Sequence, residues 1–253
     1  MGAGGVEPGR LARFDAIGSM FEVRWPGGPA YARASMESYG QFCAVARALE
    51  ILGERWTLLV VRELLLGSTG FNEIRRGLPR IPTATLAKRL QTLIAAGVVE
   101  VDASRYVLTP AGRALRPVVA DMATWALGPG QVPLEAGHLD AAALSWDIQR
   151  RIDHAAVPDR KITIALHFVD RAVGDRRYWL QLDRGRANLC ATDTGDPVDV
   201  TLRAATADVV RWWLGERSWR HLLDQPDTEI TGSRAVIRAL PSWFRGYALA
   251  AGA

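Results

Sequence analysis

A run of short apolar segments, each followed by a glycine, occupies residues 42–97 and constrains the fold of this chain more than any other feature. In each segment the apolar side chains recur at helical spacing, and the glycine stands where a helix would end. The pattern predicts four consecutive helices. They are Phe42–Leu52, Trp56–Leu66, Phe71–Arg76 and a fourth, which has Pro82 in its first turn and Gly97 at its end.

Two strand-like runs and a further helix follow the fourth helix. Val98–Asp102 and Arg105–Thr109 are separated by two residues, which predicts a tight hairpin. Thr109 is suited to cap a long helix that ends at Leu127, because a proline follows it in the first helical position. Four helices, a hairpin and a long helix in this order predict a winged helix-turn-helix arrangement.

The pattern of apolar residues changes after GPGQVP, residues 128–133, which is the clearest domain boundary. The run Lys161–Phe168 alternates large apolar residues with polar or small ones and predicts a half-buried strand. Further strands are predicted at Tyr178–Asp183, Arg186–Ala191, Val198–Arg203 and Asp227–Gly232, with helices at Leu139–His154, Thr206–Leu214, Ser218–Leu223 and Ser233–Leu240. Strands and helices at this spacing predict an α+β layer.

The expected fold class is therefore multidomain α+β, with an N-terminal winged helix-turn-helix and a C-terminal mixed α+β domain of sheet and helices. The first residues are rich in glycine, proline and alanine and have weak periodicity, so Met1, Met20 and Met36 are all candidate start residues. The expected parts are a poorly ordered leader at 1–38, the winged helix domain at 39–128, a linker at 129–138 and the second domain at 139–253.

Charge is unevenly placed along the chain. Of the 31 basic and 27 acidic residues, residues 40–130 hold eleven basic and seven acidic ones, and the remaining segments are balanced. Within residues 71–93, five basic side chains accompany Glu73 alone. Such a local excess indicates either a solvated surface or an anionic partner, of which nucleic acid is the first candidate.

Two cysteines in 253 residues do not make a disulfide framework, and no apolar run suits a membrane span or a signal peptide. We therefore expect a cytoplasmic protein without a membrane partner. The four histidines are scattered without metal-ligand spacing, and no nucleophile elbow, P-loop or dinucleotide fingerprint occurs. No catalytic residue, metal or cofactor is expected, and the chain is expected not to be an enzyme.

Five motifs follow one another in the middle of the chain: CAVARALEILGERWTLLVVRELLLG (43–67), FNEIRRGLPRIP (71–82), LAKRL (86–90), AGVVE (96–100) and YVLTPAGRAL (106–115). In order and spacing they resemble the HxlR family of bacterial winged-helix transcriptional regulators. The resemblance implies a homodimer that binds double-stranded DNA, with helices Phe42–Leu52 and Pro110–Leu127 in the dimer interface. The chain departs from the family at Ala44, where proline is common, and in its short wing, whose only basic residue is Arg105.

The fourth helix is the expected DNA-reading helix. At about 100° per residue, its core side holds Leu86, Leu90, Leu93 and Ile94. Thr85, Lys88 and Gln91 fall on the opposite side and are the best candidates for contacts with base edges, unless this side is a plain solvated face. Arginines on the preceding helix and turn are expected to contact phosphates. The expected DNA-binding residues are Arg75, Arg76, Arg80, Thr83, Ala84, Thr85, Lys88, Arg89, Gln91, Thr92 and Arg105.

Cys43 has two interpretations. It matches a cysteine that acts as a thiol redox sensor in some HxlR relatives, and the nearby Arg47 would lower the pKa of its thiol. The interpretation that we prefer is a small buried apolar residue in a dimer-interface helix. Trp56 is expected in the core rather than at a functional surface.

The second domain also carries recognisable motifs: YWLQLDRGRANL (178–189), VDVTLR (198–203), ATADVVRWWLG (205–215), ITGSRAVIRAL (230–240) and PSWF (241–244). They resemble a sterol carrier protein type 2-like domain. The resemblance implies a sheet covered by helices, which can enclose an apolar tunnel for a lipid-like ligand. Candidate pocket residues, each of which is alternatively a core residue, are Trp179, Trp212, Trp213, Trp219, Trp243 and Phe244.

Together these features predict a homodimeric transcriptional regulator that binds a pseudo-palindromic operator. Its C-terminal domain would sense a small apolar ligand or stabilise the dimer. The alternative is a small-molecule or lipid carrier whose winged helix mediates protein association, and an enzyme in the C-terminal domain is a third hypothesis. Loss of DNA affinity in Lys88→Ala and Arg76→Ala variants would separate the regulator from the carrier.

Overall fold

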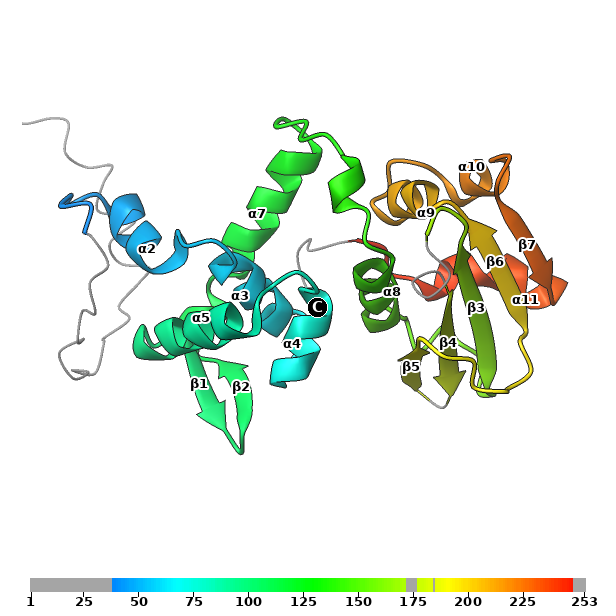
Figure 1. The fold of residues 1–253 in the computed structure, drawn as a ribbon, viewed down its shortest axis with the longest axis horizontal. Coiled ribbons are helices and arrows are strands. Elements are labelled where there is room, and N and C mark those ends of the chain that lie inside the picture. The colour runs from blue at the N-terminus through cyan, green and yellow to red at the C-terminus, as the bar shows by residue number, and fades with distance from the viewer. Residues whose placement is uncertain (1–37, 172–176, 184, 248–253) are drawn as a thin grey trace, which may run out of the picture. The chain divides into compact units, whose positions relative to one another are not determined.

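The computed structural model describes residues 38–171, 177–183 and 185–247 (Figure 1). Apart from Ser38, the predicted leader and its alternative start residues lie outside the described residues. The chain from Ser38 onward forms one contiguous unit. None of the described helices is long and apolar enough to cross a membrane.

The N-terminal part of this unit contains the predicted helices and hairpin, with most ends shifted by one or two residues. Its elements are α2 (Ala44–Leu52), α3 (Thr57–Leu65), α4 (Phe71–Gly77), α5 (Thr83–Ala95), β1 (Val99–Asp102), β2 (Arg105–Leu108), α6 (Pro110–Arg113) and α7 (Arg116–Leu127). Ala103 and Ser104 join β1 to β2 at φ values of 44° and 65°. Positive φ at both positions is typical of a type I′ hairpin turn, whose backbone twist matches that of the two strands.

The long helix predicted from Pro110 to Leu127 is wrong, since the chain forms two helices there, α6 and α7. Pro117 explains the break. It has no N–H to donate to the carbonyl of Arg113, and its ring would clash with that carbonyl. The predicted cap is confirmed, because the Gly112 N–H donates to Thr109 Oγ1 at 3.1 Å.

The core of the winged helix lies between α3, α4, α5 and the hairpin. It contains Val60, Val61, Leu64, Leu65, Ile74, Leu78, Ile81, Leu86, Leu90, Leu93, Ala96, Val98, Val99, Leu108 and Val119. Ile94 was predicted to join this core, but its exposed fraction is 38%. It lies about 80° around α5 from Leu86, at the flank of the buried stripe, and so misses the packed face. Trp56 is only partly buried and packs against the edge of the core.

The C-terminal part contains a five-stranded sheet with the order β5-β4-β3-β6-β7. The strands are β3 (Ile162–Phe168), β4 (Arg177–Asp183), β5 (Arg186–Cys190), β6 (Val200–Ala204) and β7 (Glu229–Gly232). Only β3 and β6 pair in parallel, and the other neighbours are antiparallel. The helical elements are η1 (Ala136–His138), α8 (Ala141–Arg150), α9 (Thr206–Trp213), α10 (Trp219–Leu223), α11 (Arg234–Ala239) and η3 (Leu240–Trp243). A mixed α+β architecture is therefore confirmed for this part.

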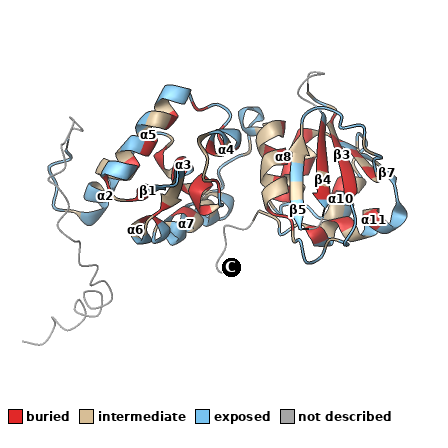
Figure 2. Cartoon of the chain, turned by 90° about the horizontal axis from the view of Figure 1, so that it is seen from below, coloured by how far each residue is buried: buried red, intermediate tan, exposed pale blue. Residues whose placement is uncertain are grey.

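The prediction that β3 is half-buried is wrong, because both of its faces are buried (Figure 2). The helices pack on the face that carries Ile162, Ile164, Leu166 and Phe168. On the other face, the connection from β5 to β6 is bound to the sheet. Asp196 accepts a hydrogen bond from Gln181 and pairs with Lys161 Nζ at 2.7 Å, and Asp199 accepts from the Thr163 N–H at 3.0 Å. Thr163 and Ala165, on this face, are almost inaccessible to solvent.

Candidate DNA-binding site

One face of α5 is anchored in the core and the other is free. The helix begins at Thr83 because Pro82, in extended conformation, precedes it. Leu86, Leu90 and Leu93 are buried, whereas Lys88 and Gln91 are exposed. The exposed side chains lie opposite the buried ones, as the helical period predicts.

The other predicted residues of α5 differ in exposure. Thr83 and Ala84 are exposed in its first turn, whereas Thr85 is half-buried. Thr92 Oγ1 donates to the Lys88 carbonyl at 3.0 Å, a bond within the helix itself. The free surface of α5 therefore centres on Lys88 and Gln91, with the first turn beside it.

Arg89 serves the fold of the single chain. Its Nη2 pairs with Glu54 Oε2 at 2.7 Å, and its Nε donates to the Arg55 carbonyl at 3.2 Å. Its side chain is 11% exposed. Arg89 therefore ties α5 to the segment between α2 and α3.

The three arginines expected near phosphates are all exposed, but they differ in their partners. Arg75 and Arg80 make no side-chain hydrogen bond or ion pair within the described part of the chain. The Arg76 guanidinium lies over the ring of Trp146 in α8, with Cζ 5.4 Å from the ring centroid. This is within the limit of about 6 Å for a cation–π contact. Arg76 therefore has a partner in the C-terminal part.

Arg105 lies in the wing and binds the segment before α4. Its Nε donates to Thr69 Oγ1 at 2.8 Å, and the Tyr106 N–H donates to the Thr69 carbonyl at the same distance. The Gly70 and Thr69 N–H groups donate to Glu73 Oε2, both at 2.9 Å, and these bonds lower the pKa of Glu73. The wing, at the end next to its turn, and the segment that starts α4 are thus joined by hydrogen bonds.

Cys43 is half-buried and precedes the first residue of α2. The backbone N–H groups of Ala46 and Val45, at the start of α2, lower the pKa of its thiol. The sequence suggested Arg47 as the cause, but the N-terminal amides of the helix account for the shift. Both interpretations of Cys43 stay predictions.

The six predicted pocket residues do not lie together. Trp212 packs against Trp219 and Phe244, with ring centroids 4.9 and 5.7 Å apart, and Trp213 lies beside Phe244 at 6.0 Å. Trp243 is buried in the core. Trp179 is on the opposite face of the sheet, because it alternates with core residues of β4.

A hollow of about 350 Å³ lies elsewhere. It is lined by His154, Val157, Pro158, Asp159 and Gly185, and by none of the predicted aromatic residues. Among the described residues, no group of three or more His, Cys, Asp or Glu side chains is arranged to hold a metal ion.

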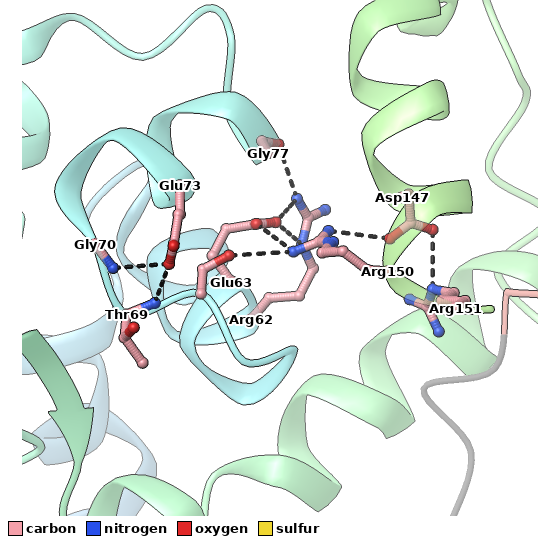
Figure 3. Close-up of polar contacts among 10 residues, drawn as sticks. Arg62, Glu63, Thr69, Gly70, Glu73, Gly77, Asp147, Arg150 and Arg151 are labelled. Carbon is pink, nitrogen blue, oxygen red and sulfur yellow. Dashed lines mark hydrogen bonds and ion pairs between the residues drawn. The ribbon is translucent and has the colours of Figure 1, made fainter. Parts of the chain in front are cut away.

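A buried ionic cluster was not predicted from the sequence. Glu63 in α3 has an exposed fraction of 0%, and its carboxylate binds Arg62 Nη2 at 2.7 Å and Arg150 Nη1 at 2.6 Å (Figure 3). Arg150 comes from α8. The sequence held one indication of it: Glu63 lies on the same stripe of α3 as Val60 and Leu64. A charged residue on a core face normally has a partner of opposite charge.

The winged helix has known relatives. The family model for HxlR-like helix-turn-helix proteins matches residues 51–130. YvaP of Bacillus subtilis, described as an uncharacterised HTH-type transcriptional regulator, is 38% identical over 87 residues, which are 32% of this chain and 81% of YvaP. Rv3095 of Mycobacterium tuberculosis, with the same description, is 38% identical over 89 residues, 32% of this chain and 56% of Rv3095.

The HTH-type transcriptional regulator YodB of Bacillus subtilis is 35% identical over 86 residues, which are 31% of this chain and 77% of YodB. The crystal structure of quinone-bound YodB matches 32% of this chain and 93% of that chain, with 36% identity and a TM-score of 0.31. The family match ends at residue 130, so the five-stranded sheet lies beyond it.

Proposed function

The chain belongs to the HxlR-like helix-turn-helix family of transcriptional regulators, and on that premise we propose that it binds a pseudo-palindromic operator as a homodimer. The observation that carries DNA contact is the free face of α5, on which Lys88 and Gln91 are exposed above a buried leucine stripe. In a helix-turn-helix the second helix enters the major groove, and α5 holds that position after α4.

The exposed side chains suit this role. The Lys88 ammonium can donate to guanine or to a phosphate, and the Gln91 amide can donate to and accept from adenine. Arg75 and Arg80 are exposed on α4 and on the turn before α5, and we propose that they contact phosphates on the DNA backbone. Arg76 can also reach a phosphate if it leaves the Trp146 ring.

The Lys88→Ala variant tests this proposal, and Lys161→Ala is its matched control. Lys161 is the only other lysine and pairs with Asp196 in the C-terminal part. We expect Lys88→Ala to weaken binding of a duplex selected by the wild-type chain roughly 5- to 150-fold, which corresponds to about 1–3 kcal/mol. Fluorescence anisotropy at several salt concentrations measures the affinity for this duplex. Equal affinity of both variants and the wild type would favour the carrier hypothesis.

Uncovered apolar faces on α2 and α7 support the homodimer. Phe42, just before α2, is 98% exposed, and Trp125 in α7 is 58% exposed. The other exposed apolar side chains of these two helices are Val45, Leu49, Val118, Met122 and Leu127. Phe42, Val45 and Leu49 recur every three or four residues, and so do Val118, Met122 and Trp125, so each helix carries one exposed apolar stripe. Leu127 falls on the opposite side of α7. Such stripes normally mark a surface that another protein covers. We assign this surface to a second copy of the chain.

Trp125→Glu is the test of the dimer. A buried carboxylate without a partner would oppose association, so the variant should sediment as a monomer and bind the operator much more weakly. Val198→Glu is the control, because Val198 is also exposed but lies in the connection before β6. A Trp125→Glu dimer as stable as the wild type would refute the assigned interface.

We infer that the C-terminal domain senses a small apolar ligand or stabilises the dimer, and that it is not an enzyme. The half-buried Trp212, Trp219 and Phe244 support an apolar binding surface. A sterol carrier-like role is part of this proposal. Native mass spectrometry of the full chain, purified from its host, tests it: a bound apolar molecule supports a sensor, and repeatedly empty protein supports dimer stabilisation.

A further inference from the structure

The starting observation is the Glu63 carboxylate, which is fully buried in α3. Burial of an ionised group is costly unless cations and hydrogen bonds compensate it. Two cations do so here: Arg62, the preceding residue, and Arg150, which comes from α8. Arg150 is therefore needed to keep this charge in the core of the winged helix.

The same carboxylate touches the end of α4. A Cβ atom built on Gly77 would lie 1.9 Å from Glu63 Oε2, so the helix end rests directly on the carboxylate. Arg62 Nη2 also donates to the Gly77 carbonyl at 3.2 Å. Gly77 is the last residue of α4, and the turn of residues 78–82 follows and leads into α5. The Glu63 cluster therefore holds the start of the turn that orients the recognition helix (Figure 3).

Helix α8 has two functional faces. Ala141, Leu144 and Ile148 belong to the core of the C-terminal sheet. Arg150 and Trp146 instead contact residues of the winged helix, namely Glu63 and Arg76. A displacement of α8 relative to its own sheet would thus disturb both contacts.

The cluster continues into the C-terminal part. Arg150 Nη2 pairs with Asp147 Oδ1 at 3.0 Å, and Asp147 Oδ2 accepts a hydrogen bond from Trp213 Nε1 at 2.8 Å. Trp213 lies against Phe244 and Trp212. An unbroken series of polar contacts therefore joins the aromatic residues of the C-terminal part to the turn before α5.

We propose that Arg150 is a positioning residue for DNA binding, through which the C-terminal domain holds the turn before the recognition helix. The proposal rests on the DNA-binding function proposed above. Without Arg150, the buried Glu63 carboxylate would keep only Arg62, which would have to leave the Gly77 carbonyl to compensate it. The start of the turn would then lose its anchor, and α5 would spend less time in the orientation that fits DNA.

The test uses the full chain and three variants: Arg150→Ala, Glu63→Gln and the double variant. Each single change should weaken binding of the selected duplex about 5- to 150-fold, the usual range of coupling between sites. The double variant should bind about as well as either single variant, because both changes remove one interaction. Arg150→Lys should fall between, since one ammonium replaces the two guanidinium nitrogens that bind Glu63 and Asp147.

Hydrogen exchange gives a second measurement that needs no DNA. Arg150→Ala should speed exchange of the Leu78 and Ile81 N–H groups, which donate to the Arg75 and Leu78 carbonyls, and leave β3 protected. Arg160→Ala is the control, because it breaks an exposed ion pair of 2.8 Å with Asp199 in the same domain. If Arg150→Ala does not fold, Arg150→Lys and Glu63→Gln carry the test.

The outcomes are separable. If wild-type protein selects no duplex, the operator proposal fails, and exchange alone decides the role of Arg150. Affinity within twofold of wild type in folded Arg150 variants overturns the positioning role. Unchanged hydrogen exchange at the turn overturns the positioning role as well. Additive losses of affinity in the double variant would mean that the two side chains act separately, which also contradicts it.

Discussion

Replacing Gly77 by alanine is expected to destabilise the winged helix, although alanine is normally the better helix former. Gly77 is the last residue of α4, at a φ that any residue can adopt, so the backbone does not require glycine there. The new methyl group would instead lie 1.9 Å from Glu63 Oε2, 2.2 Å from Cδ and 2.6 Å from Oε1. The buried carboxylate would have to move away from Arg62 or Arg150.

The size of the effect follows from three contributions. Overpacking a core costs about 1–3 kcal/mol, and losing one hydrogen bond to a charged group costs about 1.5–3 kcal/mol. Helix propensity returns about 1 kcal/mol. We therefore expect Gly77→Ala to lower the opening free energy of α3 and α4 by about 1.5 to 5 kcal/mol.

Hydrogen-exchange mass spectrometry is the appropriate assay, because it reports the opening of α3 and α4 separately from that of the sheet. Gly137→Ala is the control, since a Cβ there meets no atom within 4 Å. In a Glu63→Ala background the cost of Gly77→Ala should shrink, because the carboxylate that it meets is gone. A Gly77→Ala protein as protected as the wild type would refute the direct contact.

Three further predictions concern the winged helix. Glu73→Gln should reduce the free energy of unfolding at neutral pH, where the Glu73 carboxylate accepts two backbone N–H bonds. These bonds lower the pKa of Glu73 in the folded state, so the difference from wild type should disappear as the pH falls from 4.5 through that lower value. Urea unfolding at a series of pH values measures it. Thr109→Ala should cost about 0.5–2 kcal/mol in the same experiment, because it removes the cap of α6. The pKa of the Cys43 thiol is lowered by backbone N–H groups, so at pH 7 this thiol should react with iodoacetamide faster than an unstructured cysteine peptide does. A Cys190→Ser chain isolates the reaction of Cys43. An equal rate would contradict the lowered pKa.

The elements of the winged helix were predictable because the signals are local. Helices α2 and α4 end at or next to glycines, Gly53 and Gly77, and Thr109 caps the helix that its sequence position indicated. The break between α6 and α7 also had a local signal in Pro117, which the apolar stripe of the predicted long helix obscured. The burial of Thr163 and Ala165 had none, because it depends on which distant segments cover that face of the sheet in the folded chain.

The candidate site divides in the same way. The free face with Lys88 and Gln91 follows from helical periodicity, and the exposure of both residues agrees with it. Arg89 shares the same helix, but its partner Glu54 lies 35 residues earlier, so its role in the fold was not visible in the pattern. Periodicity assigns a residue to a face of its own helix and says nothing about the side chain that faces it.

By itself, the sequence determined where the helices of the winged helix begin and end and which side of α5 stays free, because both depend on interactions between near neighbours in the chain. Only the tertiary structure decided that Glu63 is compensated by Arg150, which is 87 residues away. A buried charge must find its partner in space, and folding alone brings α8 of one domain to α3 of the other.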